Sequence, residues 1–511
     1  MAKTRKRPHE LLAESLRNAK ETARDCVVRS ANLERRDRER LVDSGFLTEI
    51  IRGWYLLTSP DSGGGSTAWF GGFWAFVRHY LDDRFGKGNY CLSAESSLSL
   101  HAGDTSIPSQ IVVLTKKASN TTIDLPHGTS MLLLTDKNFP DDIDKFNGVS
   151  RMSLPLALCR LTASYFQKYP RNIEIVLKMS SLSVAEVSRV LLRLETIASA
   201  ERIVGAYKYL GEENKSEQVQ KDMSVAGYMI KEVNPFDSYR PKLGKSRLTS
   251  PYAGRIRLMW SMMREVVVDI MPSTPGFKQD KTNTIRIIKE TYKQDAYHSL
   301  SIEGYQVTEE LISKIESGEW DPESSEEDRR QKDAMAAKGY LNAFNEVIES
   351  VVKVLSGDDP GLILSNDLQS WYRQLFAPLV KANLLPAEKV AGYRNLPVYI
   401  TNSRHVPPPS SAVLDCMEVL FELLEKEENS FVKAVLGHFV FVYIHPYMDG
   451  NGRMGRFIMN LMLISGGYNW TVIRTSNRDR YMESLEQAST KEDISKFAEF
   501  IKFELEHWND V

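Results

Sequence analysis

The sequence is poor in several features that would assign it quickly to a class of protein. Its four cysteines are scattered along the chain with no CxxC pair: Cys26, Cys91, Cys159 and Cys416. Such spacing fits a reducing compartment and argues against a structural zinc site. No uninterrupted apolar run is long enough to span a membrane, and the N-terminus has no apolar signal region. We therefore expect a cytoplasmic protein with no membrane partner.

Excess charge and common phosphate-binding motifs are also absent. The chain has 65 Lys and Arg against 67 Asp and Glu, so its net charge of −2 gives no overall attraction to nucleic acid. There is no GxxxxGK(S/T) loop, no kinase signature and no internal repeat. Any chemistry on a nucleotide must therefore depend on another motif. At 511 residues the chain should hold two or three domains, each with its own core.

Residues 445–456, HPYMDGNGRMGR, carry most of the chemical information in the chain. His445 titrates near neutral pH, so it can take a proton from an attacking hydroxyl. Asp449 offers a hard oxygen ligand for Mg²⁺. Gly450 and Gly452 let the backbone turn tightly, so that several N–H groups can converge on phosphate oxygens. The motif suits a polyphosphate substrate.

The flanking residues predict that this motif is a loop between two buried helices. Residues 431–444 are almost all apolar at helical spacing, and residues 453–465 form a second apolar run. Arg453 and Arg456 are three residues apart, so a helix places them on one face. The GNG segment then lies at the N-terminus of the second helix, where unpaired N–H groups favour phosphate.

The motif resembles the signature of the Fic family, HxFx(D/E)GNGRxxR, with Tyr447 in place of the usual Phe. The resemblance implies a protein adenylyltransferase, which transfers AMP from ATP to a Ser, Thr or Tyr hydroxyl of a target protein. His445 would be the base, and Asp449 would hold Mg²⁺ on the α- and β-phosphates.

The resemblance also implies roles for the remaining residues of the motif. The backbone of Gly450–Gly452, together with Asn451, would form an anion hole. Arg453 would contact the β-phosphate and Arg456 the γ-phosphate. Tyr481 falls where the family often lines the adenine pocket, although a tyrosine there could equally belong to the core.

Two other interpretations of the loop remain open. Gly450, Gly452 and Gly455 fit the dinucleotide-binding pattern GxGxxG, with Arg474 about where an NADP-selecting residue would lie. That pattern requires a short strand before it, and the preceding apolar run is too long for one. The loop could also be a tight helical corner without chemistry.

A second motif, SLSIEG at residues 299–304, matches (S/T)xxxE(G/N), the inhibitory motif of many Fic proteins. Ser299 and Glu303 are one helical turn apart and share a face, with Gly304 following. The resemblance implies that Glu303 pairs with Arg456 and takes the place of the γ-phosphate, so that the chain inhibits itself in cis.

Residues 391–409 predict a short exposed hairpin, because Val398, Tyr399, Ile400 and Thr401 are followed by a run of prolines. Fic proteins carry a β-hairpin flap here, which pairs with an extended segment of the target. The alternative is an ordinary surface loop.

The N-terminal region is locally basic. Residues 1–40 hold twelve Lys and Arg and seven Asp and Glu, a net of +5. Around Gly45 and Gly53 the pattern predicts a helix, a strand, a turn and a second strand, which resembles the winged helix of AbiEi-type antitoxin regulators. That resemblance implies DNA binding through residues 1–60; the alternative is a solvated helical face.

We therefore predict a multidomain chain with an α+β N-terminal region that begins with a winged-helix-like unit, and a C-terminal all-α Fic fold with a small β-hairpin flap. Strand-like runs lie at residues 111–114 and 130–134, and helices are expected near 183–199 and at 253–271. The expected parts are a DNA-binding candidate, an α/β regulator-like region, a linker with a connecting helix, and the catalytic domain: 1–60, 61–210, 211–284 and 285–511.

Two alternatives to an autoinhibited transferase stay open. The chain could be a DNA-binding transcriptional or toxin–antitoxin regulator that uses the Fic fold as a nucleotide sensor. It could also remove AMP from proteins, with Glu303 positioning the attacking water. Self-modification and a homodimer stay open as well.

Overall fold

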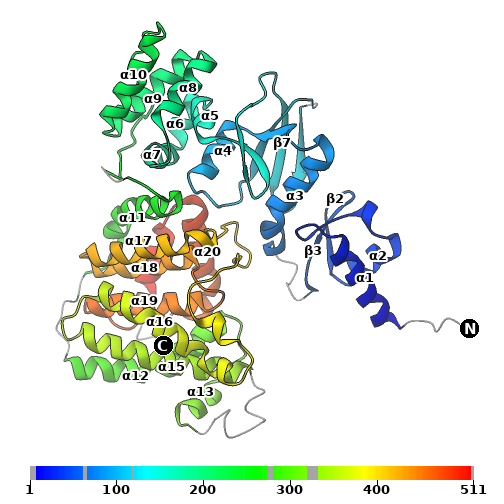
Figure 1. The fold of residues 1–511 in the computed structure, drawn as a ribbon. Helices are drawn as coiled ribbons and strands as arrows, with labels where there is room; N and C mark the ends of the chain where they lie inside the picture. Colours follow the sequence, from blue (N-terminus) through cyan, green and yellow to red (C-terminus); the bar gives the residue numbers. More distant parts are fainter. Residues whose placement is uncertain are drawn as a thin grey trace, which may run out of the picture. The chain divides into compact units, whose positions relative to one another are not determined.

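The computed structural model, shown in Figure 1, describes residues 7–60, 66–117, 120–244, 247–273, 275, 280–318 and 332–507. The chain divides into two compact units. The first comprises residues 1–251 with residues 399–406, and the second comprises residues 252–398 with residues 407–511. Helices and strands alternate in the first unit, whereas the second unit is built from helices.

The first unit begins with two helices and a three-stranded sheet, continues with further strands around a long helix, and ends in helices. Its helices are α1 (Pro8–Thr22), α2 (Arg35–Asp43), α3 (Thr67–Phe85), α4 (Ala94–His101), α5 (Leu154–Cys159), α6 (Ala163–Lys168), α7 (Pro170–Lys178), α8 (Val184–Leu194), α9 (Ile197–Tyr209) and α10 (Glu213–Val225). Its strands are β1 (Val27–Arg29), β2 (Leu47–Ile51), β3 (Trp54–Leu57), β4 (Tyr90–Leu92), β5 (Gln110–Thr115), β6 (Thr121–Leu125), β7 (Thr129–Thr135), β8 (Ile143–Phe146) and β9 (Val149–Met152).

The helix, strand, turn and strand expected near the N-terminus are present as α2, β2 and β3. Gly45 and Gly53 both have positive φ, at +73° and +87°, which explains why glycine is found at each turn. The sheet has the antiparallel order β1-β3-β2. Leu41 and Leu47 are buried in a small core with α1 residue Ala19.

A second sheet has the order β4-β5-β7-β6, in which β5 and β7 are parallel and the other pairs are antiparallel. The strand-like runs at 111–114 and 130–134 are therefore confirmed as β5 and β7. Helix α3 supplies aromatic side chains to the core of this region, including Trp69, Phe73 and Phe76. Burial of each large apolar side chain contributes about 1.5–3 kcal/mol.

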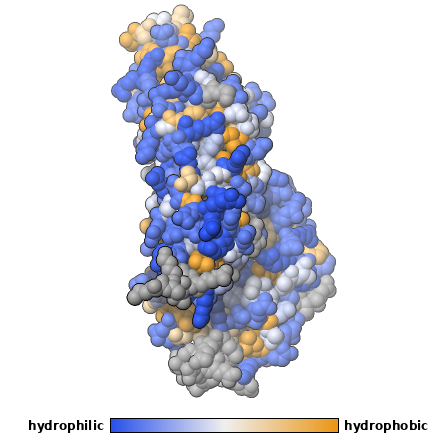
Figure 2. Space-filling model, turned by 90° about the vertical axis from the view of Figure 1, so that its right-hand side faces the viewer, coloured by the Kyte–Doolittle hydropathy of each residue, from blue (hydrophilic) through white to orange (hydrophobic). Residues whose placement is uncertain are grey.

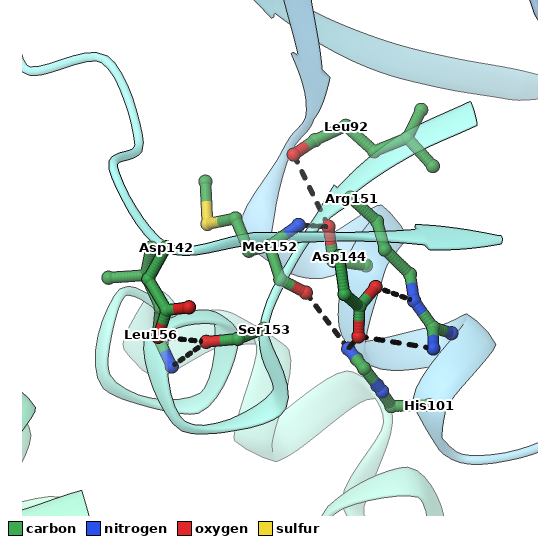
Figure 3. Close-up of polar contacts among 9 residues, drawn as sticks. Leu92, His101, Asp142, Asp144, Arg151, Met152, Ser153 and Leu156 are labelled. Atoms are coloured by element: carbon green, nitrogen blue, oxygen red, sulfur yellow. Dashed lines mark hydrogen bonds and ion pairs between the residues drawn. The ribbon is translucent and has the colours of Figure 1, made fainter. Parts of the chain in front are cut away.

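Strands β8 and β9 form a hairpin that is fixed to α4 by His101 (Figure 3). His101 Nε2 lies 2.9 Å from the carbonyl oxygen of Met152. Arg151 Nε donates to Asp144 Oδ1 at 2.6 Å across the hairpin. Burial lowers the pKa of His101, which keeps the ring neutral, so it donates to the carbonyl. His101 is thus a structural residue of the hairpin.

Two stretches differ from their sequence-based prediction. The helix expected near 183–199 is two helices, because Glu195 adopts a left-handed φ of +52° and ends α8. Part of the expected linker 211–284 is also ordered, because α10 lies within it. The polar segment that follows α10 binds the buried carboxylate of Glu174, which accepts hydrogen bonds from the N–H groups of Lys242 and Leu243.

The described part of the second unit contains helices and short turns but no β-strand, as predicted for its helical fold. The expected connecting helix at 253–271 is α11. The helices are α11 (Pro251–Ile270), α12 (Lys281–Ile302), α13 (Glu309–Glu316), α15 (Lys332–Val354), α16 (Pro360–Lys381), α17 (Val413–Lys426), α18 (Ser430–Ile444), α19 (Asn451–Ser465), α20 (Arg478–Lys491) and α21 (Ser495–Glu506).

Helices α18 and α19 pack side by side at the centre of this unit (Figure 1). Both are buried along almost their whole length. Gly455 of α19 allows close approach, because an added Cβ would lie 2.7 Å from Nδ1 of His438 on α18. The two apolar runs of the sequence thus form the central helices of the core.

The expected β-hairpin at 391–409 is not formed as strands. The prolines at 407–409 have no N–H group to donate to a ladder, and nearby backbone groups bond elsewhere. Residues 399–406 group with the first unit, where the N–H of Asn402 donates to Thr67 Oγ1 at 2.9 Å. The flap role of Val398, Tyr399, Ile400 and Thr401 stays a prediction.

The face drawn in Figure 2 is mostly hydrophilic, with apolar residues in small groups. None of the helices in the described ranges combines the length and the apolar character that crossing a bilayer requires.

The tight contact of α15 and α16 gives a test of the fold. An added Cβ at Gly339 would lie 2.0 Å from the carbonyl oxygen of Leu375. We expect Gly339→Ala to lower the free energy of unfolding by about 1–3 kcal/mol, the usual cost of overpacking. The measurement is denaturant unfolding followed by circular dichroism. Gly392→Ala is the control, because nothing lies within 4 Å of its Cβ position; equal stability of the two variants would contradict the predicted contact.

Candidate active site

The loop between α18 and α19 contains the residues that the sequence singled out. His445 ends α18 with a left-handed φ of +52°, and Gly450 precedes α19 with a φ of +80°. The Asn451 side chain closes the loop, because Oδ1 accepts from the N–H of Tyr447 at 3.0 Å and Nδ2 donates to its carbonyl at 2.9 Å. A helix rather than a strand precedes the glycines, which excludes the dinucleotide-binding pattern.

His445 is held in one orientation at the start of this loop. Its Nδ1 lies 3.1 Å from the carbonyl oxygen of Val442, which assigns the proton to Nδ1 and leaves Nε2 with a free lone pair. Burial lowers the pKa of His445 to about 4. The imidazole is therefore neutral at pH 7, as a proton acceptor must be.

Arg394 fixes the backbone of the same residues and was not found by sequence reasoning. Its Nε donates to the carbonyl of His445 at 2.7 Å, and its own N–H donates to the carbonyl of Pro446 at 2.8 Å. Arg394 is only 5 % exposed, although it lies in an irregular segment. An arginine 51 residues before the motif carries no local signal of this contact.

Tyr447 is buried. Its ring stacks on Tyr372 with centroids 3.6 Å apart and an interplanar angle of 8°. Its hydroxyl donates to Gln369 Oε1 at 3.1 Å. The hydroxyl that distinguishes tyrosine from phenylalanine thus has a partner, and the loop keeps its packing.

The first turns of α19 carry two buried arginines. Arg453 and Arg456 are 1 % and 3 % exposed. Arg456 Nη2 donates to Glu303 Oε1 at 2.7 Å, and Arg456 Nε donates to Ser299 Oγ at 2.8 Å. The predicted contact of Glu303 with Arg456 is therefore confirmed, and Ser299 binds the same guanidinium.

The Glu303 carboxylate lies at the N-terminus of α19. An added Cβ at Gly452 would be 2.2 Å from Glu303 Oε1, so glycine is required for a negative group to approach the backbone here. Partial burial acts to raise the pKa of Glu303, but the charges of Arg456 and Arg453 outweigh it and hold the pKa below its usual value. Glu303 is therefore ionised at neutral pH and occupies an anion-binding position.

Three guanidinium nitrogens at this position have no hydrogen-bond acceptor among the described residues: Arg453 Nε, Arg453 Nη2 and Arg456 Nη1. A buried N–H donor of a charged group lowers the stability of the protein when it has no hydrogen-bond acceptor. Together with the free N–H groups of the first turn of α19, they can bind more negative oxygens than Glu303 supplies. The arrangement suits a ligand with several phosphate groups.

Asp449 could hold a metal ion beside these arginines. Its side chain is 63 % exposed, with Oδ2 3.5 Å from Arg453 Nη2. Its Oδ1 accepts the N–H of Gly450 at 2.6 Å. No group of three His, Cys, Asp or Glu in the described ranges forms a metal site. A single accessible carboxylate next to a phosphate-binding position fits Mg²⁺, which often binds one carboxylate together with phosphates.

Tyr481 lies in the core behind the arginines. It is 1 % exposed, and its hydroxyl lies 2.8 Å from Nε2 of the buried His438. The rings of Phe497 and Phe500 are beside it, at 6.2 and 5.7 Å between centroids. A contact of Tyr481 with adenine stays a prediction; the observed contacts are those of a packing residue.

Comparison with known proteins places this site in a recognised domain. Residues 363–463 match the model of the Fic/DOC family. Over 225 residues the chain is 29 % identical to "Protein adenylyltransferase Fic" of Nematostella vectensis, which is 42 % of this chain and 47 % of that protein. It is 31 % identical over 222 residues to the protein of the same name from Drosophila virilis, or 42 % of this chain and 41 % of that protein.

The chain thus spans less than half the length of these curated relatives. A solved structure of Fic-1 from C. elegans aligns with 70 % of this chain and 95 % of its own, at 17 % identity and a TM-score of 0.37. This likeness is too weak to define the fold. The similarity to the relatives therefore concerns the domain and not the whole protein.

The burial of His445 predicts its titration. Because burial disfavours the imidazolium, the ring should stay neutral as the pH falls through 6.5 and become protonated only near pH 4. The measurement is an NMR titration of histidine Cε1–H signals, with His445→Ala to assign the signal. A His445 signal that titrates at or above pH 6.5 would contradict the described environment.

Proposed function

Because residues 363–463 form a Fic/DOC family domain, we propose that the chain is a protein adenylyltransferase, which moves AMP from ATP to a Ser, Thr or Tyr hydroxyl of a target protein. The single observation that carries the proposal is the pair of buried arginines with surplus donors at the N-terminus of α19. The neutral His445 supports it, because the imidazole lies at the other end of the same loop.

In the proposed reaction the target hydroxyl oxygen attacks the α-phosphorus of ATP. A new O–P bond forms as the bond from the α-phosphorus to the bridging oxygen breaks, and pyrophosphate leaves. Nε2 of His445 takes the hydroxyl proton, while Nδ1–H remains bound to the carbonyl of Val442. Arg453 and Arg456 bind the β- and γ-phosphates and stabilise the charge of the leaving pyrophosphate.

Asp449 would hold Mg²⁺, which when bound would neutralise charge on the α- and β-phosphates. The backbone of Gly450–Gly452 is proposed to bind the α-phosphate region. The Asn451 side chain contributes to this anion-binding position indirectly. It is hydrogen-bonded to the backbone of Tyr447 and thereby fixes the loop.

Glu303 is proposed to inhibit this reaction in cis. Its carboxylate binds Arg456 at 2.7 Å and lies against Gly452, where the γ-phosphate would otherwise bind. A carboxylate and a phosphate cannot share this volume, and their charges repel. ATP would then bind weakly or in an unproductive pose. Glu303 could instead position water for AMP removal, which the test below distinguishes.

DNA binding by residues 1–60 stays a prediction. Two of the four arginines of α2 form ion pairs on the same helix, Arg35 with Glu39 at 2.7 Å and Arg40 with Asp37 at 3.2 Å.

The proposal is tested by incubating the protein with α-labelled ATP, Mg²⁺ and cell lysate. We expect weak labelling by the wild type and strong labelling by Glu303→Gly. Adding His445→Ala should lower the rate of Glu303→Gly by about 10²–10⁴-fold, the usual cost of losing a general base. Glu310→Gly, which changes an exposed glutamate seven residues further on, is the matched control and should behave like the wild type.

Two outcomes would count against this function. Labelling that survives His445→Ala within a few-fold would show that His445 is not the base. If Glu303→Gly labelled no protein but lost the ability to release AMP from labelled proteins, Glu303 would be catalytic in the reverse reaction.

A further inference from the structure

The guanidinium of Arg453 contacts two aromatic rings. Its guanidinium carbon lies 5.1 Å from the ring centroid of Tyr305 and 5.3 Å from that of Phe376. These rings restrict its orientation. Nε has no hydrogen-bond acceptor among the described residues, and the nearest carboxylate to Nη2 is Asp449, 3.5 Å away at Oδ2. The two rings thus hold the arginine and leave donors for a ligand.

Tyr305 follows the inhibitory motif directly and is fixed by the end of α12. The N–H of Tyr305 donates to the carbonyl of Leu300 at 3.1 Å, and the N–H of Gly304 donates to that of Ser301 at 3.0 Å. With Gly304 at a φ of +87°, these bonds form a Schellman motif. Glu303 is therefore the C-cap residue that follows α12, and Tyr305 lies two positions beyond it.

The same helix end thus contacts both arginines of the site. Glu303 binds Arg456 through an ion pair, and Tyr305 covers one face of the Arg453 guanidinium. Glu303 and Tyr305 belong to the same Schellman motif and are separated only by Gly304. A shift of the backbone at Gly304 would move both contacts together.

We propose that Tyr305 is a positioning residue for ATP, which holds Arg453 for the β-phosphate, so that one helix end carries both the inhibitor and part of the substrate site. This inference rests on the proposed function, because it assigns Arg453 to the β-phosphate. Withdrawal of the whole helix end would release Arg453 along with Arg456.

The test measures nucleotide binding and transfer in the Glu303→Gly protein, in which the carboxylate no longer blocks the site. Tyr305→Ala should weaken ATP binding by about 2- to 30-fold, the range of a cation–π contact from exposed to desolvated. The affinity for AMP should not change, because AMP has no β-phosphate. Tyr305→Phe keeps the ring and should retain more ATP affinity than Tyr305→Ala. Tyr297→Ala is the matched control, because Tyr297 lies on α12 and its ring contacts His298.

In steady-state assays, Tyr305→Ala should raise KM for ATP more than it lowers kcat. Unchanged ATP affinity in Tyr305→Ala would overturn the proposal. An equal loss of ATP and AMP affinity would also overturn it, since that result indicates general damage to the site. Failure of the proposed function looks different: ATP would bind to the Glu303→Gly protein and respond to Tyr305→Ala, but no AMP would be transferred.

Discussion

The ion pair of Glu303 with Arg456 is the interaction on which the account of this site depends. Two guanidinium groups and a helix N-terminus place positive charge where little water can screen it. Removing one partner of a buried ion pair commonly costs about 3–5 kcal/mol. The cost should be smaller here, because the Glu303 side chain is 26 % exposed and Ser299 also binds Arg456. The site nevertheless favours an occupant with negative charge, either the carboxylate or a phosphate.

This constraint explains why the surrounding residues are arranged so rigidly. Gly452 leaves space for an anion against the backbone, and Gly455 lets α19 approach α18. Asn451 and Arg394 fix the loop that carries His445. The helix end with Glu303 and Tyr305 then closes the arginine side of the site. Each contact limits the positions that a polyphosphate can take. Holding the reacting groups in one orientation lowers the entropic cost of reaching the transition state.

The features that could be predicted from the sequence are those encoded locally. The apolar runs on both sides of residues 445–456 predicted two helices and a loop, because helical spacing and tight-turn residues act over a few positions. The contact of Glu303 with Arg456 spans 153 residues, and only the resemblance to a known motif predicted it. The strands at 111–114 and 130–134 were predicted from short apolar runs, and the tight turns at Gly45 and Gly53 from the glycines themselves.

Other features depend on tertiary contacts that have no local signature. The roles of Arg394 and Tyr305 arise from partners far away in the chain, and neither lies in a periodic pattern. The polar composition of the segment after α10 suggested a linker, whereas its backbone N–H groups satisfy the buried Glu174. The hairpin expected near Tyr399 is not formed. The prolines at 407–409 cannot donate to a strand ladder, and the N–H of Asn402 bonds to Thr67 Oγ1 instead.

The most direct measurement is a pair of crystal structures, of the wild type and of Glu303→Gly, each with a non-hydrolysable ATP analogue and Mg²⁺. We expect the γ-phosphate to bind Arg456 in the Glu303→Gly protein, with the α-phosphorus facing His445 Nε2. In the wild type, Glu303 should remain on Arg456 and the phosphates should lie elsewhere. A γ-phosphate bound to Arg456 in the same way in both proteins would contradict the claim that Glu303 occupies the phosphate position.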